Sequence, residues 1–500
     1  MIDSVFPARE EASCDQALWR GNAVSRFRRK TARSILRKDV MIWLCGLLLA
    51  LSSPLYATNL DLSAGYNVDV LSYSNLNYNP SQKDNQNYIA NDASLGIAVR
   101  NIDLPDSWNG TTMDIGVKFH ALGVSGSTAA LKGSPFGQIA NNYPNTSLTP
   151  FMENAYIRVH HILGKSIEAT IGRQNFMLGS GLLLDDDGAG FTGATVKANL
   201  PFWETSLEGF YFNTSHSIYS DNFSAPGSSF LAPNGLNLAG FTFALPTDGM
   251  WELNELVENG NGPEIDPGLG DTLTSATRSF TSLRYQINYG SLVFDGEAAL
   301  EKGQATTNGA NGAPNSITYN GNAAVVRAKW KQPLYKVGDG IAHVALAHGS
   351  GATPGETGTD TAFFPAHGHQ FDGLQRDGFG AFFAATPYAA LGTAPTASGL
   401  PQGATGIDVV SGGYTPPAYD NVSLDLDYFL YRADQVASGS RNLGDEWDVT
   451  LRRSFRSSLT VSLTGAIFLA GPAAVAGYPN TAAPAGDIAS LISFNVSGRF

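Results

Sequence analysis

The sequence predicts an all-β fold: a single transmembrane antiparallel β-barrel of about 16 strands, within a range of about 16–18, with long external loops. Apolar and polar side chains alternate along many short segments, which is the period of a β-strand. Charged residues make up only 15% of the chain, and 55 glycines favour turns and loops. No long apolar run follows the N-terminal region, which excludes a bundle of membrane helices.

The final stretch, residues 487–500, shows the alternation clearly. One face carries Ile492, Phe494, Val496, Gly498 and Phe500, and the other carries Ser493, Asn495, Ser497 and Arg499. The strand ends on an apolar residue with nothing after it to cover that residue, which suits a lipid-facing strand that closes a barrel. This end resembles the C-terminal signature of bacterial outer-membrane barrels. We therefore expect the barrel-assembly machinery to recognise the last strand.

Residues 1–57 are predicted to be a signal peptide with an extended basic leader, and residues 58–500 the barrel. Seven basic residues between Arg26 and Lys38 precede a short apolar run at 41–51, which small residues follow. This arrangement is typical of a secretory signal, here cleaved near residue 57. Alternatively, the chain starts at Met41 and has no basic leader. Both cysteines lie in the removed part, so the barrel needs no disulfide.

Cleavage would also change the charge of the chain. It leaves 22 basic and 39 acidic side chains, a net charge of −17. Such a chain does not bind nucleic acid through bulk electrostatics. Because strand-like alternation begins at residue 60, no plug domain precedes it, which disfavours a TonB-dependent transporter.

Alternating segments recur along the rest of the chain. They cover 60–70, 93–101, 113–121, 154–160, 167–171, 194–198, 204–211, 283–289, 292–301, 324–331, 342–346, a weak strand at 378–388, 422–428, 446–452, 459–463 and the closing stretch. Short turns separate some of them and long loops separate others, as in an outer-membrane barrel. The even count places both ends of the barrel on the same side of the membrane.

Residues 215–276 are predicted to form one long acidic loop. The segment carries eight acidic residues and neither Lys nor Arg. Within it, Asp248 is a candidate cap for a short helix over 248–257. We expect this loop to fold inward and narrow the barrel.

One position conflicts with the alternation. Arg173 shares the lipid-facing side with Ile171 in a regular strand, and an arginine is costly at membrane depth. Either a bulge at Gly172 turns the arginine inward, which we favour, or the strand has already left the bilayer there.

Inward-facing charged and polar side chains are the candidate pore lining. They are Arg100, Lys118, Arg158, His160, Arg173, Lys197, Glu204, Glu208, Arg284, Asp295, Glu297, Arg327 and Lys329. Basic residues come from strands close together in sequence and acidic residues from the next group, so the two groups are expected to form opposed patches. Such patches orient charged solutes and set selectivity. The alternative is a ladder of ion pairs that merely satisfies a packed interior.

Neither a cofactor nor an enzymatic site is predicted. Asp185, Asp186 and Asp187 are weak candidate ligands for Ca²⁺, although the residues lack the alternating ligand spacing of a calcium loop and a solvated turn explains them as well. A pair such as His160 with Glu168 does not define a catalytic arrangement.

Four ordered motifs resemble the alginate export family of outer-membrane barrels. They are ENAYIR at 153–158, IGRQNF at 171–176, FPAHGH at 364–369 with FDG at 371–373, and GDEWDVTL at 444–451. The resemblance implies a monomeric outer-membrane barrel, and in the named member a basic lumen that conducts an anionic polysaccharide. The lumen predicted here has mixed charge, which argues against alginate as the cargo.

The sequence therefore predicts a porin-like channel in the bacterial outer membrane. It would pass polar solutes or a polysaccharide by diffusion through a mixed-charge lumen, as a monomer in contact with outer-membrane lipid. The alternative is a surface-exposed binding or adhesive barrel with a closed lumen, in which the acidic loops bind the partner.

Overall fold

The computed structural model describes most of the barrel. The described residues are 59–76, 78, 85–105, 108–126, 149–186, 188, 190–201, 204–214, 236–265, 272–308, 314–334, 338–353, 355, 357–366, 378–383, 400, 404–455, 458–476 and 487–500. The predicted signal peptide, residues 1–57, lies outside them.

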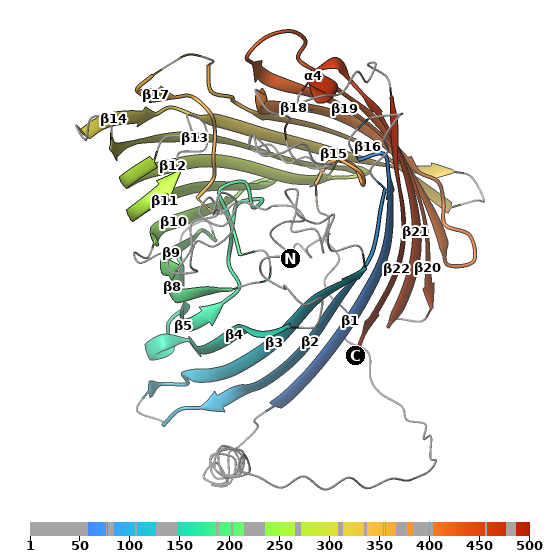
Figure 1. Ribbon diagram of the computed structural model, residues 1–500. Coiled ribbons are helices and arrows are strands. Elements are labelled where there is room, and N and C mark those ends of the chain that lie inside the picture. The colour runs from blue at the N-terminus through green and yellow to red at the C-terminus, as the bar shows by residue number, and fades with distance from the viewer. Residues whose placement is uncertain are drawn as a thin grey trace, which may run out of the picture.

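Eighteen of the described strands form one closed ring (Figure 1). In ring order they are β1 (Asn59–Ser74), β2 (Gln86–Asp103), β3 (Thr112–Gly126), β4 (Thr149–His160), β5 (Ile167–Gln174), β8 (Phe191–Asn199), β9 (Ser206–Thr214), β10 (Leu236–Pro246), β11 (Met250–Ile265), β12 (Thr272–Tyr289), β13 (Leu292–Asn308), β15 (Asn322–Leu334), β16 (Gly338–Gly349), β18 (Ala404–Thr415), β19 (Val422–Val436), β20 (Asn442–Phe455), β21 (Leu459–Ala470) and β22 (Ile488–Arg499). Each strand pairs antiparallel with the next, and β22 pairs with β1, so that Val496 lies opposite Val68. The cylinder therefore has no free strand edge.

Shorter elements lie in the connections. They are η3 (Ile162–Gly164), β6 (Met177–Leu178), β7 (Leu184–Asp185), β14 (Pro314–Tyr319), β17 (Thr359–Asp360) and α4 (Pro472–Ala476). β14 pairs with β13 and extends the sheet, and β17 pairs in parallel with β14. Among the described residues, no helix has the length and apolar character needed to cross a membrane.

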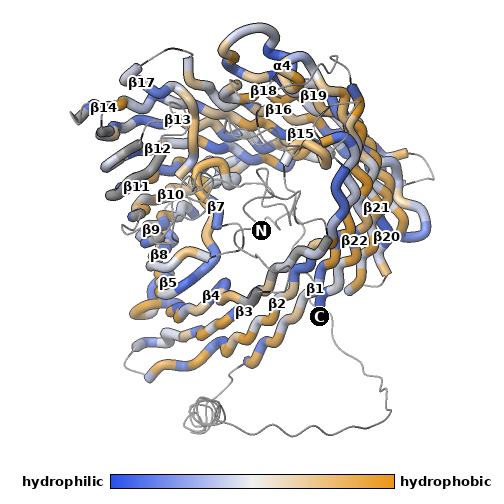
Figure 2. Tube along the Cα trace, in the orientation of Figure 1, coloured by the Kyte–Doolittle hydropathy of each residue, from blue (hydrophilic) through white to orange (hydrophobic). Residues whose placement is uncertain are grey.

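The outer wall of the barrel is apolar, as the alternation predicts. Leu62 of β1, Ile171 of β5 and Ile492 of β22 are 65%, 66% and 59% exposed. Hydrophobic residues alternate with hydrophilic ones along the strands in Figure 2. Tyr289 and Trp330 are exposed beside short turns at one rim, where aromatic rings are favoured at a membrane interface. Lipid is the solvent that this wall fits.

The inner wall is polar at the seam of the ring. Asp69 of β1 accepts a hydrogen bond from the hydroxyl of Ser493 on β22 at 2.5 Å, and Asn67 accepts one from Asn495 at 2.8 Å. These are the side chains that the alternation places opposite the lipid-facing set. The two faces of the closing strand are confirmed.

The connections differ in length at the two ends of the barrel. Turns such as 247–249 and 290–291 join strands at one end, whereas segments such as 175–190 and 350–403 join them at the other. Outer-membrane barrels keep short turns on the periplasmic side and long loops outside. We use this rule to name the two ends.

The strand count is 18, at the upper end of the predicted range, because two strands, β10 and β11, were missed and one, β18, was placed too early in the chain. The predicted loop at 215–276 is wrong: residues 236–246 and 250–265 are β10 and β11, and β12 begins at residue 272. The helix predicted over 248–257 is also wrong. Glu252, Glu255 and Glu258 have a helix-like spacing, but β11 is held extended by pairing with β10 and β12.

The weak strand predicted at 378–388 is not a strand in its described part, residues 378–383. The wall is completed instead by β18, which lies later in the same Gly- and Ala-rich region and pairs with β16 and β19. Composition alone hid this strand, since glycine and alanine weaken the alternation that marks the others.

A charge placed on the outer wall should destabilise the barrel. Leu463 of β21 faces outward, whereas the neighbouring Ser462 lines the interior. We expect Leu463→Arg to lower the free energy of unfolding by about 2–4 kcal/mol, the cost of an arginine near the bilayer midplane. Ser462→Arg should lower it much less, because the new side chain meets water. Urea unfolding in lipid vesicles measures both, and equal losses would contradict the assignment of the faces.

Candidate functional site

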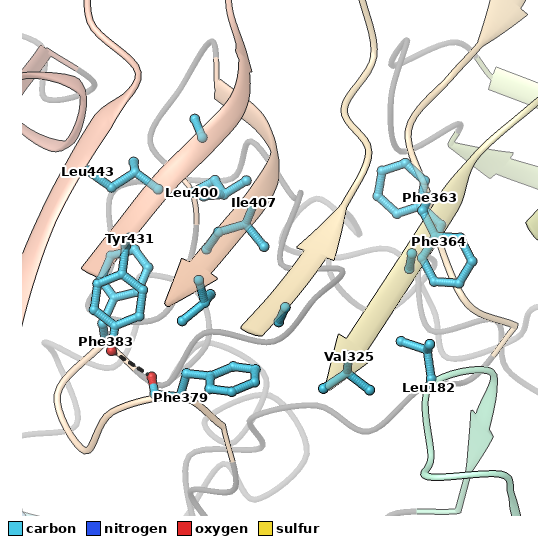
Figure 3. Packing of buried hydrophobic residues seen from close by; sticks show 14 of the residues in the cluster. Leu182, Val325, Phe363, Phe364, Phe379, Phe383, Leu400, Ile407, Tyr431 and Leu443 are labelled. Carbon is cyan, nitrogen blue, oxygen red and sulfur yellow. Dashed lines mark hydrogen bonds between the residues drawn. The ribbon is translucent and has the colours of Figure 1, made fainter. Parts of the chain in front are cut away.

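Segments of two long connections fold into the barrel and pack there as an apolar cluster (Figure 3). Residues 175–190 contribute Leu178, Leu182, Leu183 and Leu184, and the connection between β16 and β18 contributes Phe363, Phe364, Phe379, Phe382, Phe383 and Leu400, all nearly fully buried. They pack with inward side chains of the wall such as Val325, Ile407 and Tyr431. Apolar side chains on the loops thus cover apolar patches of the inner wall.

Glu446 of β20 holds residues 378–383 in place. Its carboxylate, which is fully buried, accepts hydrogen bonds from the backbone N–H groups of Phe382 at 2.5 Å and Phe383 at 3.0 Å. The Tyr431 hydroxyl lies 3.0 Å from the same carboxylate and 2.8 Å from the carbonyl oxygen of Phe379, the contact drawn in Figure 3. Glu446 therefore replaces the water that these donors lose.

Glu297 of β13 holds the loop at 175–190. One carboxylate oxygen accepts hydrogen bonds from the backbone N–H of Ser180 at 2.7 Å and from its hydroxyl at 2.5 Å. Arg284 of β12 donates to the carbonyl oxygen of Gly179 at 2.7 Å and pairs with Asp295 at 2.8 Å. The acidic and basic groups of β12 and β13 thus bind the backbone of an inward loop.

Arg278 and Glu301 make a third anchor on the same strands. Arg278 pairs with Glu258 at 2.7 Å and with Glu301 at 3.0 Å, and donates to the carbonyl oxygen of Phe364 at 2.9 Å. Glu301 accepts the backbone N–H of Phe364 at 2.9 Å. Every charge in this group is buried and hydrogen-bonded, as a buried charge requires.

An open polar cavity of about 540 Å³ remains on the side of the lumen formed by β1–β4 and β20–β22. Its wall includes Asn67, Asp69, Asp92, Lys118, His120, Glu153, Thr450, Arg452, Ser462, Thr464, Ser493, Asn495, Ser497 and Arg499. Hydroxyl and amide groups alternate with charges of both signs. This part of the lumen offers hydrogen-bond donors and acceptors.

His120 is at the centre of a charged cluster on that cavity wall. Its Nε2 lies 2.5 Å from a carboxylate oxygen of Asp92, and its Nδ1 lies 3.2 Å from one of Glu153. Lys118 pairs with the same Glu153 at 2.8 Å. The cluster combines two acidic and two basic groups, so this wall is close to neutral when the histidine is protonated.

The predicted pore-lining residues of β2–β9 are interleaved by charge, not separated into opposed patches. Arg100 pairs with Asp61, Arg158 lies 3.4 Å from Glu168, His160 lies 2.9 Å from Glu168 and 3.1 Å from Asp114, and Lys197 lies opposite Glu168 and Glu208 in the sheet register. This is the ladder of ion pairs that the sequence left open as the alternative. Further round the wall, Arg327 lies 4.0 Å from Asp295, and Lys329 is exposed on the inner face.

Two predicted lining residues lie elsewhere. Glu204 precedes β9 in a turn, with a left-handed φ of 53°. Arg173 keeps the outward parity of Ile171, since β5 pairs with both neighbours without a register shift at Gly172. The favoured bulge is therefore wrong. The Arg173 guanidinium lies 3.4 Å from the Thr192 hydroxyl near the loop end of β5, which fits a strand leaving the bilayer.

Asp186 is part of the inward loop, and its carboxylate is bound by groups of that loop and not exposed to a cation. Its carboxylate accepts hydrogen bonds from the side chain of Asn175 at 2.6 Å and from the backbone N–H groups of Phe176 at 3.0 Å and Gly190 at 2.8 Å. Burial raises the pKa of Asp186 above its ordinary value. Asp185 belongs to β7, and Asp187 lies outside the described residues.

Sequence reasoning missed the anchoring role of Glu301 and Glu446 and the part played by Arg278. The alternation places the two glutamates on the inner face, but their loop partners are 63 and 64 residues away in the chain. The available signal was the small inward neighbours of Glu301, Ala299 and Gly303, beside which water would be scarce, whereas Glu446 has Gly444 and the charged Asp448 as its inward neighbours. Such a signal predicts a buried carboxylate but not the backbone N–H group that donates to it.

Together these features define a class of protein. A closed antiparallel cylinder with an apolar exterior, a polar interior and loops packed inside is a transmembrane β-barrel of the bacterial outer-membrane type. Its lumen is narrowed, and a polar cavity is left beside the loops.

Comparison with known proteins gives likenesses of fold. The chain is similar to OccAB1 of Acinetobacter baumannii, with 10% identity and a TM-score of 0.49 over 88% of this chain and 97% of that one. OccK5 (OpdH) of Pseudomonas aeruginosa and a BenF-like porin of Pseudomonas fluorescens Pf-5 each show 11% identity and a TM-score of 0.48 over 88% and 98%. No family model and no curated protein matches the chain. The comparisons do not support the resemblance to the alginate export family.

Removing the Glu446 carboxylate should release residues 378–383. Glu446→Ala leaves the backbone N–H groups of Phe382 and Phe383 without their acceptor, at about 1–3 kcal/mol for each buried group left unsatisfied. We expect lower stability and a larger single-channel conductance as the segment leaves the lumen. Asp445→Ala, the adjacent carboxylate on the outer side of the same strand, is the control. Unchanged conductance in Glu446→Ala would contradict the anchoring role.

Proposed function

We propose that this protein is a diffusion channel of the bacterial outer membrane for small polar solutes. The observation that carries the proposal is the polar cavity of about 540 Å³ that remains between the packed loops and the wall. Its volume lies within the range of pockets that hold small molecules. A closed, packed interior does not require hydroxyl, amide and charged groups that face water.

The mixed charges of the cavity favour small polar solutes of either sign as the cargo, and they disfavour a strongly charged polymer. Arg452 and Arg499 lie on the wall formed by β20–β22, and Asp92, Lys118 and Glu153 lie on the wall formed by β2–β4. An anionic polysaccharide would meet carboxylates along its path, and like charges repel it. We therefore do not extend the proposal to alginate.

The alternative, an adhesive barrel with a closed lumen, is less well supported. It relied on residues 215–276 as a surface loop, but β10 and β11 of this segment are part of the wall. Association as a monomer and recognition of β22 by the assembly machinery remain part of our proposal.

A large side chain in the cavity should reduce the flow of ions. Ser493 of β22 lines the cavity, and the adjacent Ile492 faces lipid. We expect Ser493→Trp to lower single-channel conductance severalfold in planar bilayers, because the indole occupies the passage, and Ile492→Trp to leave it unchanged. The absence of any channel activity in the refolded wild-type protein at several salt concentrations would contradict the proposed function itself.

A further inference from the structure

A band of charged side chains lies on the outer surface of β16, β18 and β19, directly beyond the apolar wall. Leu346, Val410 and Leu430 form one row across these three strands, and the first two are 52% and 49% exposed. The next row, two residues further along each strand, is His348, Asp408 and Arg432. The step between the rows is about 7 Å. The surface therefore changes from apolar to charged within one side-chain layer.

The band lies at the loop end of the barrel. β16 leads from His348 into the long connection 350–403, and β18 begins beyond that connection at Ala404. By the rule that long loops face outward, this row is level with the headgroups of the outer leaflet. Side chains at that depth meet the phosphate groups of lipids and not their acyl chains.

Arg432 of the band and Arg441, which lies just before β20, differ in their contacts. Arg441 is held by Asp434 at 3.0 Å, by Asp408 at 3.4 Å and by the carbonyl oxygen of Ala433 at 2.8 Å. Arg432 is exposed and has no ion-pair partner within the described part of the chain. Its register partner is Asn442, the residue after Arg441, so the two arginines share one patch of the outer face.

His348, Asp408 and Asp434 by themselves resemble a cation site, because their ligand atoms lie within 4.8 Å of one another. The Arg441 guanidinium, however, already contacts both carboxylates, and His348 lies 2.7 Å from Asp408. The carboxylates are therefore bound to a protein cation. Their role in this arrangement is to fix the direction of Arg441, which leaves the remaining N–H groups of both arginines for an anion.

We propose that Arg432 and Arg441 form a binding site for the phosphate of a phosphorylated lipid in the outer leaflet. Arginine is suited to this ligand because its planar N–H groups match two phosphate oxygens at once. Leu346, Val410 and Leu430, one row below, offer the acyl chains of the same lipid an apolar surface. The continuity of the charged row with this apolar wall favours a lipid as the source of the phosphate.

Binding of lipid A to the detergent-solubilised full-length protein tests the proposal. We expect Arg432→Gln combined with Arg441→Gln to weaken binding of fluorescently labelled lipid A by about tenfold or more, since two charge-assisted contacts are lost. Arg453→Gln is the matched control. Arg453 faces outward on β20 at the periplasmic end of the wall, where it pairs with Asp420 at 3.4 Å, and its loss should leave lipid A binding unchanged.

A single variant, a dephosphorylated lipid and competition by inorganic phosphate complete the test. Arg432 has no hydrogen-bond or ion-pair partner within the described part of the chain, so Arg432→Gln alone should still weaken binding severalfold with normal single-channel conductance. Dephosphorylated lipid A should bind weakly to the wild type. Equal binding of that lipid, or wild-type affinity in the double variant, would overturn the site. Displacement of lipid A by an equal concentration of inorganic phosphate would overturn its assignment to a lipid.

Discussion

The structure depends on the pairing of β22 with β1. In lipid, a backbone N–H or C=O group without a partner costs several kcal/mol, because no water is present to replace the missing bond. A sheet satisfies its inner strands but not its two edges. Joining the last strand to the first over Ser490–Arg499 and Gly65–Ser74 removes both edges at once. Every other feature, including the apolar wall and the lumen, presupposes this closure.

Closure creates a second problem, which the interior solves. A ring of 18 strands encloses more space than inward side chains of a single wall fill. The chain fills part of it with loops, whose backbone groups must then be satisfied away from water. Glu297, Glu301 and Glu446 accept those N–H groups, and leucine and phenylalanine side chains pack between loop and wall. The same charges therefore hold the loops in place and limit the open width of the lumen.

The part of the lumen without loops keeps the mixture of charges that the strands carry. His120, Asp92 and Glu153 lie on one wall, and Arg452 and Arg499 on the other. These charges are spread over several strands and have both signs, so the described lining of the cavity is not of one sign. In the channel that we propose, such a lining would discriminate by size and hydrogen bonding more than by net charge.

Most of the wall is predictable from local pattern, since a strand between lipid and water must alternate, and β1 and β22 do so residue by residue. The alternation did not predict β11, because Glu252, Glu255 and Glu258 do not all lie on one face of a strand. It did not predict β18 either, because glycine residues make the apolar and polar faces of that strand hard to distinguish. There the neighbouring strands decided the conformation, through the Glu258 pair with Arg278 and the Glu255 contact with Thr281.

The sequence by itself determined that the protein is a barrel, which side of each regular strand meets lipid, and that the lumen has mixed charge. These are properties of a residue and its neighbours in the chain. Only the tertiary structure decided which inward charges line the cavity and which anchor loops. That choice depends on whether a backbone donor from a loop distant in sequence takes the place of water beside the carboxylate. The alternation of neighbouring residues carries no information about such a long-range contact.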